Sequence, residues 1–266
     1  VDAVISPKGA GALSAHIADG TSAGGGKRGA RAVDWQTQRT SSGQVASGNN
    51  SVIAGGQNNI ASGIFSVIGG GAGNTVSASN ATVAGGISCQ ATSTYATIGG
   101  GNTNIAGGAY SFIGGGNANT ASANFSAVGG GSSNAASGDY SAVLGGFQAT
   151  TRGLYGTWAW ASGVFSSQGD AQEQHAVLRA TTTNGTTTGL SPDAGTPAAA
   201  TSVVLPNNSM YCFEATVSAK VATFGDRAAF KITGAISRGA NAAATQIDGT
   251  LTVTPIAAIG GASAWT

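Results

Sequence analysis

Charged residues are scarce in this sequence. Asp, Glu, Lys and Arg make up 8% of the 266 residues, against about 25% in an ordinary soluble domain. Eleven basic and ten acidic residues leave a formal net charge of +1. This balance argues against a strongly basic nucleic-acid-binding surface and against an acidic disordered tail, so no nucleic-acid partner is expected.

Long hydrophobic runs, cysteine and aromatic residues are also sparse. No run of about 18 apolar residues occurs, so we expect neither a transmembrane helix nor membrane insertion. The two cysteines, Cys89 and Cys212, are far apart and predict no disulfide framework and no metal site. Glycine is in excess, with 45 copies, but is not spaced in threes as collagen requires. The composition favours a repetitive β architecture over most enzymes.

A 15-residue repeat fills the middle of the chain. Its first position is occupied in turn by Asn50, Phe65, Asn80, Tyr95, Tyr110, Phe125, Tyr140 and Tyr155. Three residues later each copy has an apolar residue: Ile53, Ile68, Val83, Ile98, Ile113, Val128, Val143 and Trp158. A glycine pair follows in all but the last copy, and most copies then have an asparagine: Asn59, Asn74, Asn104, Asn119 and Asn134. The eight copies keep one spacing without an insertion.

Each copy predicts one coil of a parallel β-solenoid. The segment 65–70 alternates and contains β-branched residues, so it predicts a short strand, and the glycine pair predicts a turn. The stretch from the asparagine onward predicts a second short strand and turn. Stacked about 4.8 Å apart, eight coils would form a rod about 38 Å long. The asparagine column is expected to form a hydrogen-bonded ladder.

The small size of the coil predicts self-association. Each coil offers two or three sizeable apolar side chains, and we expect a lone coil to enclose almost no core. The segment 40–164 has only Asp139 and Arg152 as charged groups, so a free monomer would expose a neutral surface. We therefore predict a homotrimer in which three chains share an axial core.

The flanks divide the chain into three predicted domains. Residues 1–39 lack the repeat and predict an irregular collar with a few strands, residues 40–167 form the β-roll, and residues 168–266 predict an antiparallel, jelly-roll-like β-sandwich. In the last part strands are expected at 176–182, 201–205, 210–222, 228–240 and 250–256. Apolar and polar residues alternate cleanly in 210–222, and residues 223–227 predict the hairpin loop that follows it. Loops on a rigid scaffold carry recognition. The candidate receptor contacts there are Asn207, Asn208, Ser209, Phe224, Asp226 and Arg227.

Two resemblances follow from these motifs. Repeats such as 137–146 (SGDYSAVLGG) and 62–74 (SGIFSVIGGGAGN) resemble the heads of trimeric autotransporter adhesins, which implies a left-handed, three-chain parallel β-roll. The flanking stretches 8–36 and 168–187 resemble segments of tail-fibre and other virion proteins of tailed bacteriophages. The second resemblance implies a non-enzymatic structural or receptor-binding part of a phage virion, a tail fibre or spike.

Its expected partners are two further copies of itself, other virion proteins and a host cell-surface polysaccharide or protein; no cofactor is expected. The first alternative is the head of a bacterial surface adhesin, with secretion and anchor sequences elsewhere in the full gene. The second is a polysaccharide depolymerase tail spike, whose paired carboxylates the repeat block lacks because Asp139 is its single carboxylate. An ice-binding solenoid would need a regular threonine column, which is absent.

Other apparent motifs favour structural roles. The stretch Gly24–Gly29 (GGGKRG) lacks the order of a phosphate-binding loop. His175, with Asp170 and Glu173, and His16, with Asp19, are weak candidates for metal or acid–base chemistry. Cys89 is expected to be a packed residue in the asparagine column. The aromatic first positions predict a stack or an inter-chain core, with a sugar-binding platform as the alternative, and Trp158 and Trp160 are expected to cap the rod.

Overall fold

The computed structural model describes residues 13–14, 19–164, 166–178, 209–220, 227–239 and 245–259. Within these ranges every regular element is a β-strand, so the predicted all-β class is confirmed. The chain divides into two compact units, Val1–Ser202 and Val203–Thr266. Each unit is described by itself.

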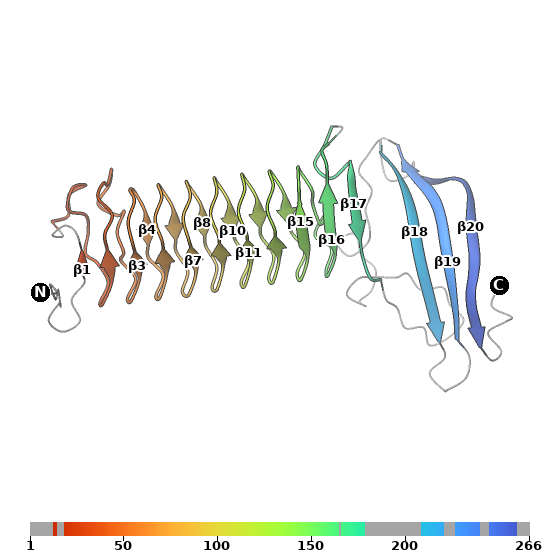
Figure 1. Ribbon diagram of the computed structural model, residues 1–266, viewed down its shortest axis with the longest axis horizontal. Helices are drawn as coiled ribbons and strands as arrows, with labels where there is room; N and C mark the ends of the chain where they lie inside the picture. The colour runs from red at the N-terminus through yellow and green to blue at the C-terminus, as the bar shows by residue number, and fades with distance from the viewer. Residues whose placement is uncertain are drawn as a thin grey trace, which may run out of the picture. The chain divides into compact units, whose positions relative to one another are not determined.

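The first unit is a parallel β-solenoid with coils repeating every 15 residues (Figure 1). Its larger sheet has eleven strands, in the order β1 (Leu13–Ser14), β2 (Val33–Asp34), β3 (Val52–Ile53), β5 (Val67–Ile68), β7 (Thr82–Val83), β9 (Thr97–Ile98), β11 (Phe112–Ile113), β13 (Ala127–Val128), β15 (Ala142–Gly146), β16 (Trp158–Ala161) and β17 (Gln172–His175). Its second sheet has six, β4 (Ile60–Ala61), β6 (Thr75–Val76), β8 (Gln90–Ala91), β10 (Ile105–Ala106), β12 (Thr120–Ala121) and β14 (Ala135–Ala136). The predicted two short strands per coil are confirmed.

The coils are held together by backbone hydrogen bonds between equivalent positions. Val67 donates its N–H to the carbonyl of Ala81 at 3.0 Å, and Gly69 donates to Val83 at the same distance. In each short strand the second residue is buried and the first faces outward, as the period of two requires. The fixed coil length follows, because an insertion would shift every later pair.

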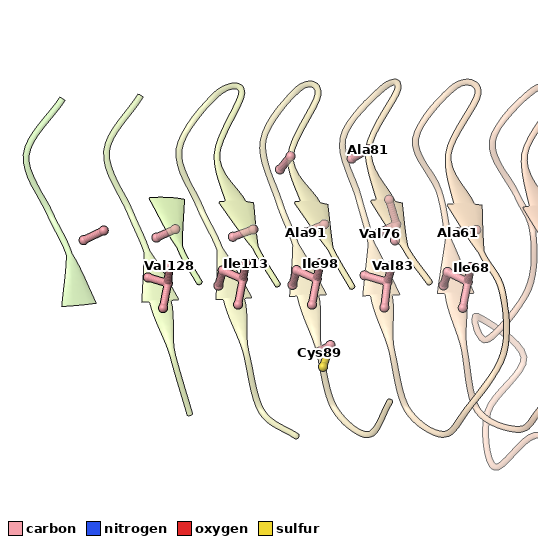
Figure 2. Close-up of a cluster of buried hydrophobic side chains, with 14 of the residues drawn as sticks. Ala61, Ile68, Val76, Ala81, Val83, Cys89, Ala91, Ile98, Ile113 and Val128 are labelled. Atoms are coloured by element: carbon pink, nitrogen blue, oxygen red, sulfur yellow. The ribbon is translucent and has the colours of Figure 1, made fainter. Parts of the chain in front are cut away.

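Each coil buries its own apolar side chains. Ile53, Ile68, Val83, Ile98, Ile113, Val128 and Val143 are at most 1% exposed. Facing them across the coil are small residues, such as Ala61, Val76 and Ala91 in Figure 2. The expectation that a lone coil encloses almost no core is therefore wrong. One branched and one small residue suffice, because the coil is too narrow to hold more, so core burial gives no reason for a trimer.

The last coil departs from the predicted 15-residue spacing. Ala142 pairs with Trp158 and Val143 with Ala159, so sixteen residues separate these partners. Gly145 pairs with Trp160, which restores the usual spacing because Leu144 is bulged out of the ladder and 59% exposed. Trp158 therefore does not take the inward position that Val143 occupies one coil earlier; Ala159 does, and is fully buried.

The solenoid extends beyond the predicted repeat block at both ends. Strand β2 pairs in parallel with β3, although residues 1–39 lack the 15-residue spacing of the repeat. At the other end β17 pairs antiparallel with β16, covering the last strand of the larger sheet. Gln172 donates to the carbonyl of Thr150 and accepts from its N–H, both at 2.8 Å, and so covers the end of the smaller sheet. The capping shown by the described residues thus comes from β17 and Gln172, whereas the tryptophans expected to cap the rod lie in β16, which β17 covers.

The second unit contains an antiparallel three-stranded sheet, β18 (Ser209–Lys220), β19 (Arg227–Arg238) and β20 (Thr245–Ile259). The hairpin and alternation predicted for β18 are confirmed, and the strand predicted at 250–256 lies within β20. The strand predicted at 201–205 lies outside the described residues, as do 179–182, and 176–178 form no strand. The predicted antiparallel architecture is present as this sheet, and the described residues contain no second sheet of a sandwich.

Candidate functional site

The predicted receptor contacts do not form one cluster. Asn207, Asn208, Phe224 and Asp226 lie outside the described residues. Ser209 begins β18 opposite Arg238, whereas Arg227 begins β19 opposite Lys220. These two positions are at opposite ends of a twelve-residue strand pair, about 37 Å apart at about 3.4 Å per residue. A ligand contacting both would have to span the whole sheet.

The predicted aromatic stack is confirmed. The rings of Tyr95, Tyr110, Phe125 and Tyr140 lie on successive coils with centroids 4.8 to 4.9 Å apart and interplanar angles of at most 14°. Tyr155 follows at 5.2 Å but is tilted by 54°, because the extra residue in the last coil moves it out of line. All five side chains remain 39 to 54% exposed.

The stack leaves ring edges rather than ring faces available. Within it each ring face lies against the next ring, at the spacing of neighbouring strands. A sugar docks on an aromatic side chain through the ring face. The geometry therefore supports the structural stack over the sugar platform for the central rings, Tyr110 and Phe125.

The first repeat position is also strained. Phe65, Tyr95, Tyr110, Phe125 and Tyr140 all have φ between 54° and 60°, a left-handed conformation that disfavours bulky side chains. The same conformation is adopted by Asn50 and Asn80 in other coils, and asparagine tolerates it better. The backbone therefore does not require an aromatic residue there, and stacking offsets the strain from Tyr95 to Tyr140 but not at Phe65, whose neighbours in the column are asparagines.

The asparagine ladder is confirmed in detail. The Asn119 side chain donates through Nδ2 to the carbonyls of Gly115 at 2.9 Å and Gly131 at 3.0 Å, and its Oδ1 accepts from the N–H of Asn134 at 3.0 Å. Other copies repeat these contacts. Sequence analysis missed the first member of the ladder, Gln36, whose Oε1 accepts from the N–H of Asn59 at 2.8 Å.

Cys89 is packed, as predicted. It is fully buried, and its N–H donates to Oδ1 of Asn74 at 2.9 Å. Its thiol lies 3.6 Å from the carbonyl of Gly101. Because a thiol replaces the carboxamide, Asn104 has no Oδ1 from the preceding coil to accept its N–H. The ladder is interrupted at this point.

A buried ionic cluster in the N-terminal coil was not predicted. Asp34 takes the inward position opposite Ile53, and its Oδ2 lies 3.0 Å from both Arg28 Nε and Arg39 Nη2. All three side chains are at most 3% exposed. Arg28 belongs to the stretch 24–29, so that stretch has a structural role. The available signal was the alternation of residues 33–36, which puts Asp34 and Gln36 on the inward side.

The predicted histidine clusters do not converge. His175 Nε2 lies 2.7 Å from Glu173 Oε1, and its ring stacks on Trp158 with centroids 4.1 Å apart. Asp170 instead accepts from the N–H groups of Ser166 and Ser167. Both His175 and Glu173 are more than half exposed. The pair therefore caps an edge of the solenoid.

The remaining acidic candidates, Asp139 and Asp19, accept hydrogen bonds from groups in turns. Asp139 Oδ1 accepts from the N–H of Asn124 at 2.9 Å, one coil earlier. Asp19 accepts from the hydroxyl and the N–H of Thr21, and the hydroxyl hydrogen bond foremost lowers the pKa of this exposed carboxyl. His16 lies outside the described residues.

The part of the chain that the structure describes contains no group of three or more His, Cys, Asp or Glu side chains placed to hold a metal ion. In those same residues no helix is long and apolar enough to cross a membrane. No protein-family model matches the chain, and no curated protein matches it either.

Proposed function

We propose that this chain is a non-enzymatic structural and receptor-binding component of a tailed-phage virion, a tail fibre or spike. In this proposal it is a homotrimer whose solenoid serves as a rigid spacer and whose C-terminal part is the tip or a joint. It contacts other virion proteins at one end and a host polysaccharide or protein at the other. The support is the resemblance of its flanking segments to phage virion proteins.

The regular solenoid carries the spacer role. From β3 to β15 the larger sheet has the same two-residue ladder in every coil, with no inserted loop. The buried asparagine side chains of this stretch, Asn119 among them, are bonded to backbone groups of neighbouring coils. Fully satisfied buried polar networks rigidify a structure, so this repeated ladder suits a rigid spacer.

Immunogold electron microscopy tests this proposal. Antibodies raised against the purified full chain should label tails or spikes of phage particles released from the source cells. Label on the outer surface of uninfected cells would instead favour the adhesin alternative and overturn the virion assignment. Degradation of capsular polysaccharide by the pure chain would favour the depolymerase.

Receptor binding is tested with the full chain on host cells. The chain should bind cells and reduce phage adsorption, whereas a chain that does neither contradicts the tip role. Because Ser209 and Arg227 lie at opposite ends of the sheet, Ser209→Ala and Arg227→Ala should not both weaken binding. The variant that does so identifies the contacting end.

A further inference from the structure

Trp160 presents an indole ring to solvent at the C-terminal end of the solenoid. It lies in β16 between Ala159 and Ala161, which are fully buried, so the alternation of the strand points the Trp160 side chain outward. The side chain is 47% exposed. Among the described residues no second aromatic ring lies against it, and its Nε1–H donates no hydrogen bond. Apolar ring atoms and a hydrogen-bond donor are therefore both available there.

The two residues paired with Trp160 leave the indole open on one side and place a carboxylate on the other. Its partner in β15 is Gly145, where a Cβ would meet no heavy atom within 4 Å. Its partner in β17 is Glu173. Directly paired residues on antiparallel strands have Cβ atoms about 4.5–5.5 Å apart. The Glu173 carboxylate is therefore within reach of a molecule that rests on the indole.

His175 holds this carboxylate in place. Its Nε2 lies 2.7 Å from Oε1 of Glu173, and its ring stacks on Trp158 at a centroid distance of 4.1 Å. Within the described residues Glu173 has no other partner, so Oε2 remains able to accept a hydrogen bond. The two tryptophans of β16 therefore differ: a ring face of Trp158 is covered by His175, whereas no ring covers Trp160.

We propose that Trp160 and Glu173 form a binding site for a neutral hexose saccharide. A pyranose ring has C–H groups on one face, which pack on an aromatic ring face, and hydroxyl groups around its rim. A hydroxyl at the rim can donate to Oε2 of Glu173, and hydrogen bonds to a charged group are about twice as strong as neutral ones. The indole N–H can donate to a sugar oxygen. An acidic saccharide would instead be repelled by the carboxylate.

Trp35 shows what an exposed tryptophan lacks without such neighbours. It is 40% exposed in the N-terminal coil. The register of β2 and β3 puts it beside Ala54, and the adjacent residues Asp34 and Gln36 are fully buried. No carboxylate is therefore available to a ligand on the Trp35 ring from these neighbours. Trp35 is a matched control for Trp160, because the two side chains have similar exposure.

This inference does not depend on the virion assignment. The site lies within the first unit, whereas the receptor contact of the proposed fibre lies in the C-terminal part of the chain. Saccharide binding would be retained if the chain were the head of an adhesin. Immunogold labelling tests the virion assignment, and titration of the purified chain tests the saccharide site, so either can fail alone.

Titration of the full chain followed by tryptophan fluorescence tests the site. The probes are three neutral tetrasaccharides, the β-1,4-linked tetramers of glucose, mannose and galactose. At least one should bind saturably with a Kd of about 1 mM. Trp160→Ala should weaken this binding about tenfold or more, and Trp35→Ala should leave it unchanged. Absence of binding to all three, or equal effects of the two substitutions, would overturn the proposal.

A second variant keeps the test decisive if Trp160→Ala perturbs the end of the solenoid. Glu173→Gln keeps the length of the side chain and an oxygen for His175 but removes the charge. It should weaken the tetramer that binds best and strengthen binding of the uronic-acid counterpart of that tetramer, which the wild type should bind less well. Misfolding cannot produce such a gain. If the preference for the neutral sugar is the same in Glu173→Gln and the wild type, the proposed site is wrong.

Discussion

At the scale of single residues, the buried asparagines stabilise the coils more specifically than any apolar side chain. Each copy closes a turn of its own coil and bonds to the coil on either side, except Asn104, which follows Cys89. Buried polar groups are costly when they lose their partners. Substitution of one of these asparagines should therefore lower the free energy of unfolding by more than the small volume of the side chain indicates.

Asn119→Ala should lower the free energy of unfolding by about 3 kcal/mol, because it strands the N–H of Asn134 and two glycine carbonyls. Urea denaturation of the full chain measures this. The control is Asn117→Ala, an exposed position in the same coil, which should change the value by less than about 0.5 kcal/mol. Equal effects would contradict the role of the ladder.

Cys89→Asn should stabilise the protein by about 1 kcal/mol. The carboxamide would restore the missing acceptor for Asn104 and donate to the carbonyl of Gly101, as Asn119 does for Gly131. Thermal unfolding followed by circular dichroism measures the gain. Cys89→Ala, which removes the thiol without completing the ladder, should be destabilising, and a loss of stability in both variants would refute this account.

Residues in the repeat could be predicted from the sequence, whereas those outside it could not. The asparagine column was visible because five copies share one spacing. The buried Arg28, Asp34 and Arg39 occur once, and an isolated charged residue ordinarily predicts a solvated surface. The alternation of residues 33–36 is too short to outweigh that expectation, and the backbone pairing of Asp34 with Ile53 establishes that its position is inward.

At the scale of the element, the turn glycines set how closely the coils approach. Gly131 has a φ of 88°, and a Cβ there would lie 2.1 Å from the carbonyl oxygen of Gly146. Gly130, its neighbour, has no heavy atom within 4 Å of a Cβ. Gly131 therefore limits the spacing between coils, whereas its neighbour Gly130 does not.

Gly131→Ala should destabilise the solenoid by more than about 3 kcal/mol, because it combines a steric clash with an unfavourable φ. Gly130→Ala should change stability by less than about 1 kcal/mol. Urea denaturation compares the two. If both substitutions are tolerated, close packing at this turn does not determine the coil spacing.

The aromatic stack is expected to be nearly neutral for the stability of one chain. Phe125→Asn loses two ring contacts, at about 0.5–1.5 kcal/mol each, but relieves a left-handed conformation that costs about 1–2 kcal/mol. Its free energy of unfolding should stay within about 1 kcal/mol of the wild type. Phe125→Ala loses the contacts without the relief and should be the less stable variant. The reverse order would contradict this balance.

The repeat spacing predicted the strands but not the register of the last coil. Tyr155 keeps the 15-residue spacing in the sequence, yet one extra residue before Trp158 and the bulge at Leu144 cancel each other within the ladder. Compensating shifts of this kind leave the 15-residue spacing of the sequence unchanged. They are visible only from which backbone groups pair.

At the scale of the whole molecule, the first unit behaves as a one-dimensional stack. Its coils contact their neighbours, so its stability is close to a sum of coil and interface contributions. The sequence identified this architecture and the antiparallel second part. It did not identify how the core is covered, because the packing of one branched and one small side chain depends on the width of the coil.

Removing one whole coil should therefore be tolerated. Deletion of residues 97–111 joins Ala96 to Phe112 in the original register and should leave a folded solenoid about 4.8 Å shorter. Deletion of 97–110 removes one residue fewer and would turn Phe112 inward in place of Ile98. Circular dichroism and thermal unfolding should show a cooperative transition only for the first; cooperative unfolding of both would contradict the dependence on register.

The covered end of the solenoid has a consequence for how the protein responds to proteolysis. Between β2 and β17, a peptide break followed by separation of the two pieces would leave a fragment whose terminal coil is bare. Such a surface is a template of unpaired backbone groups that matches the bare end of every other fragment. Limited proteolysis within the repeats should thus convert the solenoid into seeds for templated growth of filaments.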